Sequence, residues 1–66
     1  MTGIFYDPAC RRLRLVRGKP EPGWAFVTHN VEASSHHCRR ILRELVPPEE
    51  LATIDWRIED DDHRSA

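Results

Sequence analysis

The residues best suited to metal or nucleophilic chemistry in this 66-residue chain are histidines and cysteines, and three of them form the run His36-His37-Cys38. These side chains are zinc ligands, and Cys10 and His29 are available as further ligands. The spacing argues against a metal site, because consecutive helix residues point about 100° apart and helical ligand pairs lie three or four residues apart. We therefore expect no metal and no cofactor. We expect Cys38 to be a small buried hydrophobe and both histidines to lie at the surface.

Cys10 is the candidate for nucleophilic catalysis. A catalytic cysteine needs electropositive surroundings and a histidine within hydrogen-bond reach. Arg11 and Arg12 follow Cys10 and meet the first condition, but the sequence places no histidine beside it. The acidic run 60–62 has nothing to hold two carboxylates at a fixed separation. Because so short a chain also offers little room for a substrate pocket, we expect no catalytic residues and no enzyme activity.

Arginines give the strongest functional signal. One group falls on a predicted hairpin beside Phe5 and Tyr6, and a second group falls on the exposed face of a predicted helix. Such a surface contacts phosphates through its charges and stacks bases on its rings. The residues predicted to contact a partner or a nucleic acid are Arg11, Arg12, Arg14, Arg17, Arg39, Arg40 and Arg43.

Internal pairing is a second interpretation of the hairpin arginines. Asp55 and Glu59 are predicted on the outer face of the last strand, where they can pair with Arg12 and Arg14 across the sheet. The formal net charge of −1 and the pI near 6.4 are also far from the strongly basic values of nucleic-acid-binding domains. The sequence leaves both interpretations open.

Four strands are predicted to position these side chains: two show alternation of apolar and polar residues, and two are rich in aliphatic and aromatic residues. Asp7-Pro8 suits a type I turn, so the first two strands are expected to form a hairpin. Two prolines between two glycines then mark a loop. The predicted strands span residues 3–7, 12–15, 24–28 and 53–59.

Between the third and fourth strands the apolar period changes to that of a helix. Cys38, Ile41, Leu42 and Leu45 fall at i, i+3, i+4 and i+7, and Val31 lies on the same stripe. The pattern predicts one amphipathic helix that is capped by Thr28 or Asn30. It ends near Val46 because Pro47-Pro48 follows, and Pro48 is expected to begin a single helical turn over residues 48–51.

These elements predict an α+β domain with the order β-β-β-α-β. We expect a small, mostly antiparallel sheet with one amphipathic helix packed on one face. Residues 1–59 form the single domain, and residues 60–66 form a disordered acidic tail.

Composition sets the remaining expectations. Hydrophobic residues at 39% and charged residues at 32% favour a folded chain over a disordered one. No run is long and apolar enough for a membrane helix, the N-terminus does not resemble a secretory signal, and two cysteines are too few for a disulfide-rich scaffold. We therefore expect a cytoplasmic protein with no membrane contact and two free thiols.

The sequence favours a non-catalytic protein-interaction or accessory module that self-associates, most simply as a homodimer. A chain of this size has a thin core, and its sheet has two open edges that a second copy can cover. The alternative is a small nucleic-acid-binding protein that uses the basic hairpin Arg11 to Arg17. The sequence identifies neither the partner nor the pathway.

Overall fold

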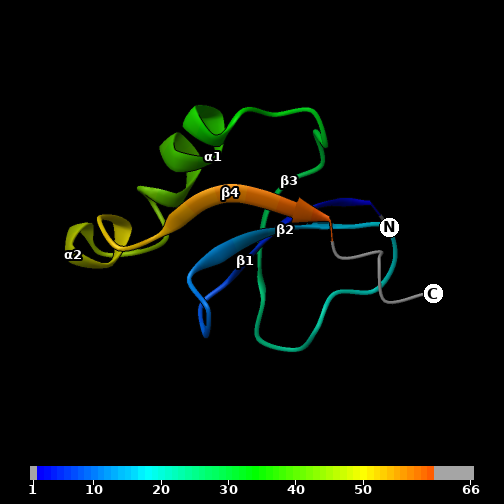
Figure 1. Ribbon diagram of the computed structural model, residues 1–66, viewed down its shortest axis with the longest axis horizontal. Coiled ribbons are helices and arrows are strands. Elements are labelled where there is room, and N and C mark those ends of the chain that lie inside the picture. Colours follow the sequence, from blue (N-terminus) through cyan, green and yellow to red (C-terminus); the bar gives the residue numbers. More distant parts are fainter. Residues whose placement is uncertain (1, 61–66) are drawn as a thin grey trace.

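The first two strands form a hairpin around a turn that Asp7 holds in place. In the computed structural model, which describes residues 2–60, β1 (Gly3–Asp7) runs antiparallel to β2 (Arg12–Val16) (Figure 1). The Asp7 carboxylate accepts hydrogen bonds from the backbone N–H groups of Ala9, at 3.0 Å, and Cys10, at 3.4 Å. Arg11 closes the turn in the left-handed region, with a φ of 56°. The predicted hairpin is confirmed.

The four strands form one mixed sheet in the order β3-β1-β2-β4. β3 (Ala25–Thr28) is antiparallel to β1, whereas β4 (Asp55–Asp60) is parallel to β2. The α+β class is confirmed, but the sheet is not antiparallel throughout. The parallel pair forms because residues 29–54 carry the chain from one edge of the sheet to the other, and a crossover of this length allows parallel pairing.

The main helix, α1 (Ser35–Leu42), is half the length that the apolar stripe predicted. Its N-cap is Ser34, whose hydroxyl accepts a hydrogen bond from the His37 N–H at 3.1 Å. The predicted caps form turns of their own: Thr28 accepts from the Asn30 N–H, and Asn30 accepts from the Glu32 N–H. These side chains compete with the helix for the backbone donors, so the helix begins later than predicted.

The chain leaves α1 before it reaches the proline pair. The sequence predicted that Leu45 would lie on the buried stripe. This prediction is wrong, because Leu45 lies beyond the end of α1 and is 55% exposed. Val31, which precedes the helix, is also exposed. The single turn α2 (Pro48–Leu51) has Pro48 at its first position, as predicted.

The core lies between α1 and one face of the sheet. Cys38 and Leu42 are the α1 residues buried there, and Tyr6 is buried beneath them on β1. The Tyr6 hydroxyl donates a hydrogen bond of 2.5 Å to Glu50 Oε2, which ties the sheet to α2. The buried core cluster comprises Ile4, Tyr6, Leu13, Val27, Ala33, Cys38, Leu42 and Ile54.

The opposite face of the sheet is partly covered as well. Figure 1 shows the β2–β3 connection on the side of the sheet away from α1. Phe5 and Val16 are buried without belonging to the core cluster, and the ring of Phe26 packs edge-on against Phe5 with centroids 5.5 Å apart. Pro20 from the connection lines a small hollow with the two phenylalanines. The sheet thus has a helical face and a second, thinner apolar layer.

The last strand extends one residue beyond its predicted end, because Asp60 belongs to β4 and pairs with Leu15. Residues 61–66 of the predicted acidic tail lie outside the described residues. Within residues 2–60, neither helix is long and apolar enough to cross a membrane.

Candidate interaction surfaces

The arginines of β2 pair with carboxylates on the neighbouring strands. Arg14 lies 2.7 Å from Glu59 and 3.3 Å from Asp7, and Arg12 lies 3.0 Å from Glu59. Arg12 also approaches Asp55 at 3.8 Å. The pairing follows from register, because Arg14 is opposite Glu59, and Arg12 is opposite both Asp7 and Asp55. This arrangement matches the interpretation of internal charge pairing for the hairpin.

Arg14 is the most enclosed arginine of this network. Its side chain is 16% exposed and that of Asp7 is 7% exposed, and its guanidinium lies 5.7 Å from the centre of the Trp24 ring. Burial by itself lowers the pKa of Arg14, but the hydrogen bond to Asp7 and the charges of Glu59 and Asp7 raise it above its usual value. Arg14 is therefore a structural cation held by two carboxylates.

The other two hairpin arginines also have partners within the chain. Arg11 donates a hydrogen bond of 2.9 Å to Thr53 Oγ1, and Arg17 pairs with Asp60 at 2.6 Å. All four predicted hairpin residues therefore donate to side chains of this protein.

Arg57 pairs with Asp55 near the start of β4 at 2.9 Å. The side-chain hydrogen bond from Arg57, with its backbone N–H, lowers the pKa of Asp55 to about 2. Asp55 therefore remains a carboxylate at any pH at which the protein is ordinarily handled. The outer face of β4 is charged but internally matched.

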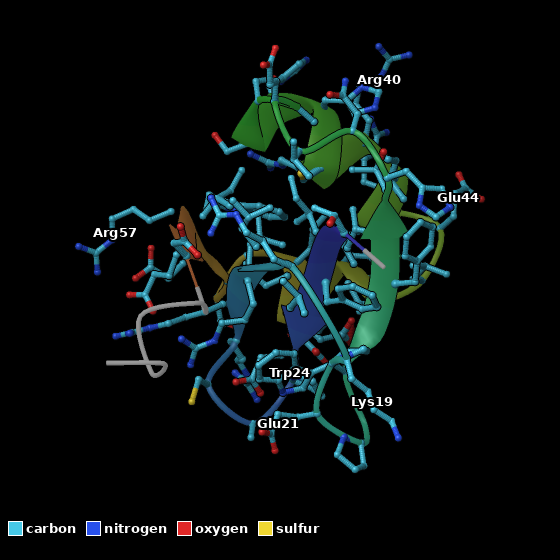
Figure 2. All side chains as sticks on the ribbon, turned by 90° about the vertical axis from the view of Figure 1, so that its right-hand side faces the viewer. Lys19, Glu21, Trp24, Arg40, Glu44 and Arg57 are labelled. Atoms are coloured by element: carbon cyan, nitrogen blue, oxygen red, sulfur yellow. The ribbon has the colours of Figure 1, made fainter. Side chains whose placement is uncertain are left out.

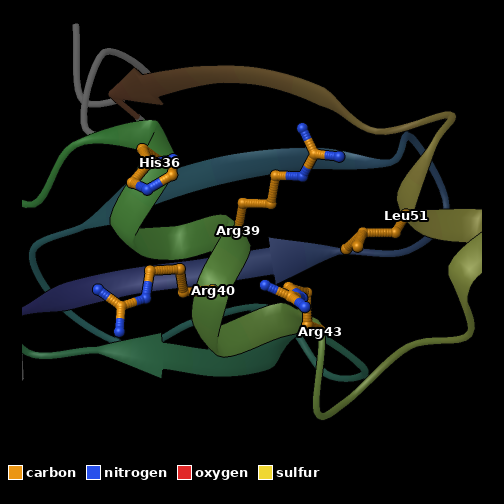
Figure 3. Close-up of a pocket in the computed structure, with 5 residues that line it drawn as sticks. All are labelled: His36, Arg39, Arg40, Arg43 and Leu51. Atoms are coloured by element: carbon orange, nitrogen blue, oxygen red, sulfur yellow. The ribbon is translucent and has the colours of Figure 1, made fainter.

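The arginines of α1 differ from those of the hairpin. Arg39, Arg40 and Arg43 are exposed, and within residues 2–60 none of them forms an ion pair with a carboxylate. With His36 and Leu51 they line a hollow of about 350 Å³. Figure 3 shows Arg39 and Arg43 on the side of α1 toward Leu51 and Arg40 on the side away from it. We call the part formed by Arg39, Arg43 and Leu51 the α1–α2 hollow.

A second surface lies at the outer edge of β3, and the sequence did not predict it. Phe26 is 42% exposed there, and Leu45 is exposed on the helical side of the same edge. Together with four more α1-side residues they line a groove of about 620 Å³, which we call the β3-edge groove. Its lining residues are Phe26, His37, Arg40, Ile41, Glu44 and Leu45.

The cysteines and histidines do not assemble into a site. Cys10 is an exposed free thiol in the β1–β2 turn, and Cys38 is a buried free thiol on α1. Burial raises the pKa of Cys38, which keeps it a neutral thiol. In the part of the chain that the structure describes, no three His, Cys, Asp or Glu residues lie close enough to hold a metal ion.

No protein-family model, curated protein or solved structure matches the chain. What can be said of its class therefore comes from its own structure. It is a small α+β domain with a four-stranded mixed sheet, a charge-paired hairpin, a basic hollow on α1 whose arginines have no carboxylate partner within residues 2–60, and a groove at the edge of β3.

Proposed function

We propose that the protein is a non-catalytic interaction module that self-associates as a homodimer through the β3-edge groove. The observation that carries this proposal is the exposure of Phe26 and Leu45 along the outer edge of a sheet. Large apolar side chains that gather at one place on a small protein favour an interface.

The two edges of the sheet differ in a way that supports this choice. Edge strands that must avoid pairing carry charges or proline. β4, with the sequence DWRIED, has four charged residues, whereas β3, with the sequence AFVT, has none. Apart from the ladder with β1, no backbone hydrogen bond engages the residues of β3 within the described chain. β3 is thus the edge on which a second strand can be added.

The charges along the groove favour a second copy of the same chain as the partner. Arg40 and Glu44 both line the groove, carry opposite charges and are four residues apart in the sequence. A two-fold axis that pairs β3 with β3 also brings the two α1 segments together in opposite directions. Arg40 of one copy then faces Glu44 of the second copy, and the reverse contact forms as well. The groove is self-complementary under this symmetry.

A charge-swap experiment tests the symmetry directly. We expect the unmodified protein to be a dimer by native mass spectrometry and light scattering. Arg40→Glu places two glutamates opposite each other at both contacts, and Glu44→Arg does the same with two arginines, so each variant alone is expected to be monomeric. An equimolar mixture should restore a heterodimer, and the double variant should restore the homodimer.

Two controls have matched charge changes far from the groove. Lys19→Glu and Glu21→Arg alter exposed residues of the β2–β3 connection, which Figure 2 shows at the opposite end of the molecule from Arg40 and Glu44. Both controls should remain dimeric. A monomeric unmodified protein would overturn self-association itself. A dimer that survives both single charge reversals would instead place the interface elsewhere.

Nucleic-acid binding through the basic hairpin is the alternative function. The contacts of Arg11, Arg12, Arg14 and Arg17 support it less, because a phosphate would have to displace partners that these arginines already have. A gel shift with single-stranded DNA at low salt, lost in Arg12→Gln, would favour it. No shift at low salt would exclude it.

A further inference from the structure

We propose that the α1–α2 hollow is a second binding site, for an acidic segment of a partner protein that carries an apolar side chain beside its carboxylates. The proposal does not depend on self-association. Arg39 and Arg43 lie on the side of α1 toward Leu51, and neither lines the β3-edge groove.

The first argument is the contrast among the arginines of this chain. Arg12, Arg14, Arg17 and Arg57 each pair with a carboxylate at 3.0 Å or closer. The α1 arginines form no such pair within residues 2–60, although they lie beside one another. Guanidinium groups bind carboxylates through two parallel hydrogen bonds, so the hollow offers donors that the fold itself does not use.

The second argument is that Arg39 and Arg43 are held in place although they repel each other. They are four residues apart, a spacing at which like charges destabilise a helix. The Arg39 guanidinium lies 5.9 Å from the centre of the Trp56 ring, which fixes its position on the sheet side of the hollow. An anion between the two arginines would remove the repulsion without reorganising Arg39.

The third argument concerns the kind of anion. The hollow combines charged and apolar lining, because Leu51 lies beside the arginines. The labelled side chains spread along the helix and do not converge on one point (Figure 3). A small inorganic ion would touch only part of this surface, whereas an extended peptide with several carboxylates and one aliphatic side chain would contact both the arginines and Leu51.

The chain contains its own reporter and its own internal control. It has two tryptophans, and each lies against an arginine. Trp56 lies against Arg39, which has no carboxylate partner in the described chain, whereas Trp24 lies against Arg14, which pairs with Glu59 and Asp7. A ligand in the hollow should shift the indole N–H resonance of Trp56 and leave that of Trp24 in place.

The experiment titrates the ¹⁵N-labelled full chain with the blocked peptide Glu-Glu-Leu-Glu-Glu and follows both indole resonances. We expect a saturable shift of Trp56 alone. Arg39→Gln and Arg43→Gln should each weaken binding about tenfold, the size of one lost charge-assisted hydrogen bond. Arg57→Gln, which changes an exposed arginine outside the hollow, should leave the affinity unchanged.

Three comparison ligands at equal ionic strength decide the chemistry. The peptide Gln-Gln-Leu-Gln-Gln should not bind, and inorganic phosphate and oligothymidylate should bind at least tenfold more weakly than the acidic peptide. Tighter binding of oligothymidylate would make this a nucleic-acid site, and equal binding of phosphate would make it a small-anion site. Either result overturns the proposal, as does a Trp56 resonance that does not move. Repeating the titration on Phe26→Ala, which changes the β3-edge groove and no residue that lines the hollow, separates this outcome from the result on self-association.

Discussion

At the residue scale, Asp7 shows how one side chain serves both local and long-range structure. One carboxylate oxygen accepts the turn N–H groups of Ala9 and Cys10, and the other lies 3.3 Å from Arg14. The sequence predicted the turn from Asp7-Pro8 and offered pairing of Arg12 and Arg14 with Asp55 and Glu59 as one of two interpretations. It did not predict the Asp7–Arg14 contact, because that contact depends on the register of the hairpin, which places these residues diagonally on one face.

Replacing Asp7 should separate these two contributions. Asp7→Ala removes the turn acceptor and leaves the enclosed Arg14 with one carboxylate fewer, so we expect the free energy of unfolding to fall by about 3 kcal/mol. Asp7→Asn keeps the acceptor and loses only the charge, and it should cost about half as much. Urea unfolding of the isolated variants measures both values.

The matched control for Asp7 is Asp55→Asn, which weakens the exposed pair with Arg57. Because exposed ion pairs contribute little, this change should cost much less than Asp7→Ala. Equal destabilisation by Asp7→Ala and Asp55→Asn would mean that the enclosed position of Arg14 has no energetic consequence.

At the element scale, the length of α1 is what the sequence could not settle. Thr28, Asn30 and Ser34 are all good N-cap residues, and the apolar stripe runs past all of them. The structure uses the first two for turns and the third for the cap. Apolar periodicity does not show which side chains accept hydrogen bonds from backbone N–H groups ahead of the helix. The length of α1 was therefore overestimated at both ends. The early end of α1 is what exposes Leu45.

The role of Ser34 can be tested by Ser34→Ala, with Ser35→Ala as its neighbour control. Ser34 accepts the His37 N–H, whereas Ser35 begins α1 and caps nothing. We expect Ser34→Ala to lower the free energy of unfolding by about 1 kcal/mol and Ser35→Ala to change it by a few tenths. Thermal unfolding followed by circular dichroism gives the comparison. A neutral Ser34→Ala would move the functional cap to one of the two earlier residues.

At the scale of the whole molecule, the sequence predicted the bounds of the strands and of α2 but not the order of the strands in the sheet. All four strands and the turn α2 form within two residues of their predicted bounds. The strand order places β3 and β4 at opposite edges, and this depends on pairing between distant segments that alternation does not encode. The β3-edge groove follows from that order, because it leaves the uncharged β3 at an edge of the sheet.

The Tyr6–Glu50 hydrogen bond joins the sheet to α2. Because it requires a protonated Tyr6 hydroxyl, the stability of the fold is expected to decrease at alkaline pH. Burial, followed by the hydrogen bond to Glu50, raises the pKa of Tyr6 from 10.0 to about 12. Because the folded-state pKa is the higher one, the stabilisation is complete below pH 10 and is lost as pH rises toward 12. A shift of this size corresponds to about 3 kcal/mol. Tyr6 is the only tyrosine, so the ultraviolet absorbance of tyrosinate reports its ionisation directly.

Tyr6→Phe provides the comparison. It removes the hydroxyl and leaves Glu50 accessible to water, so it should cost about 1 kcal/mol near neutral pH. Above pH 10, where the unmodified protein loses stability as Tyr6 ionises, the variant should lose less, and the unfolding midpoints of the two proteins should converge. Parallel pH profiles for the two proteins, or a tyrosinate titration centred near 10 in the folded state, would show that the link between sheet and α2 does not hold Tyr6 in its neutral form.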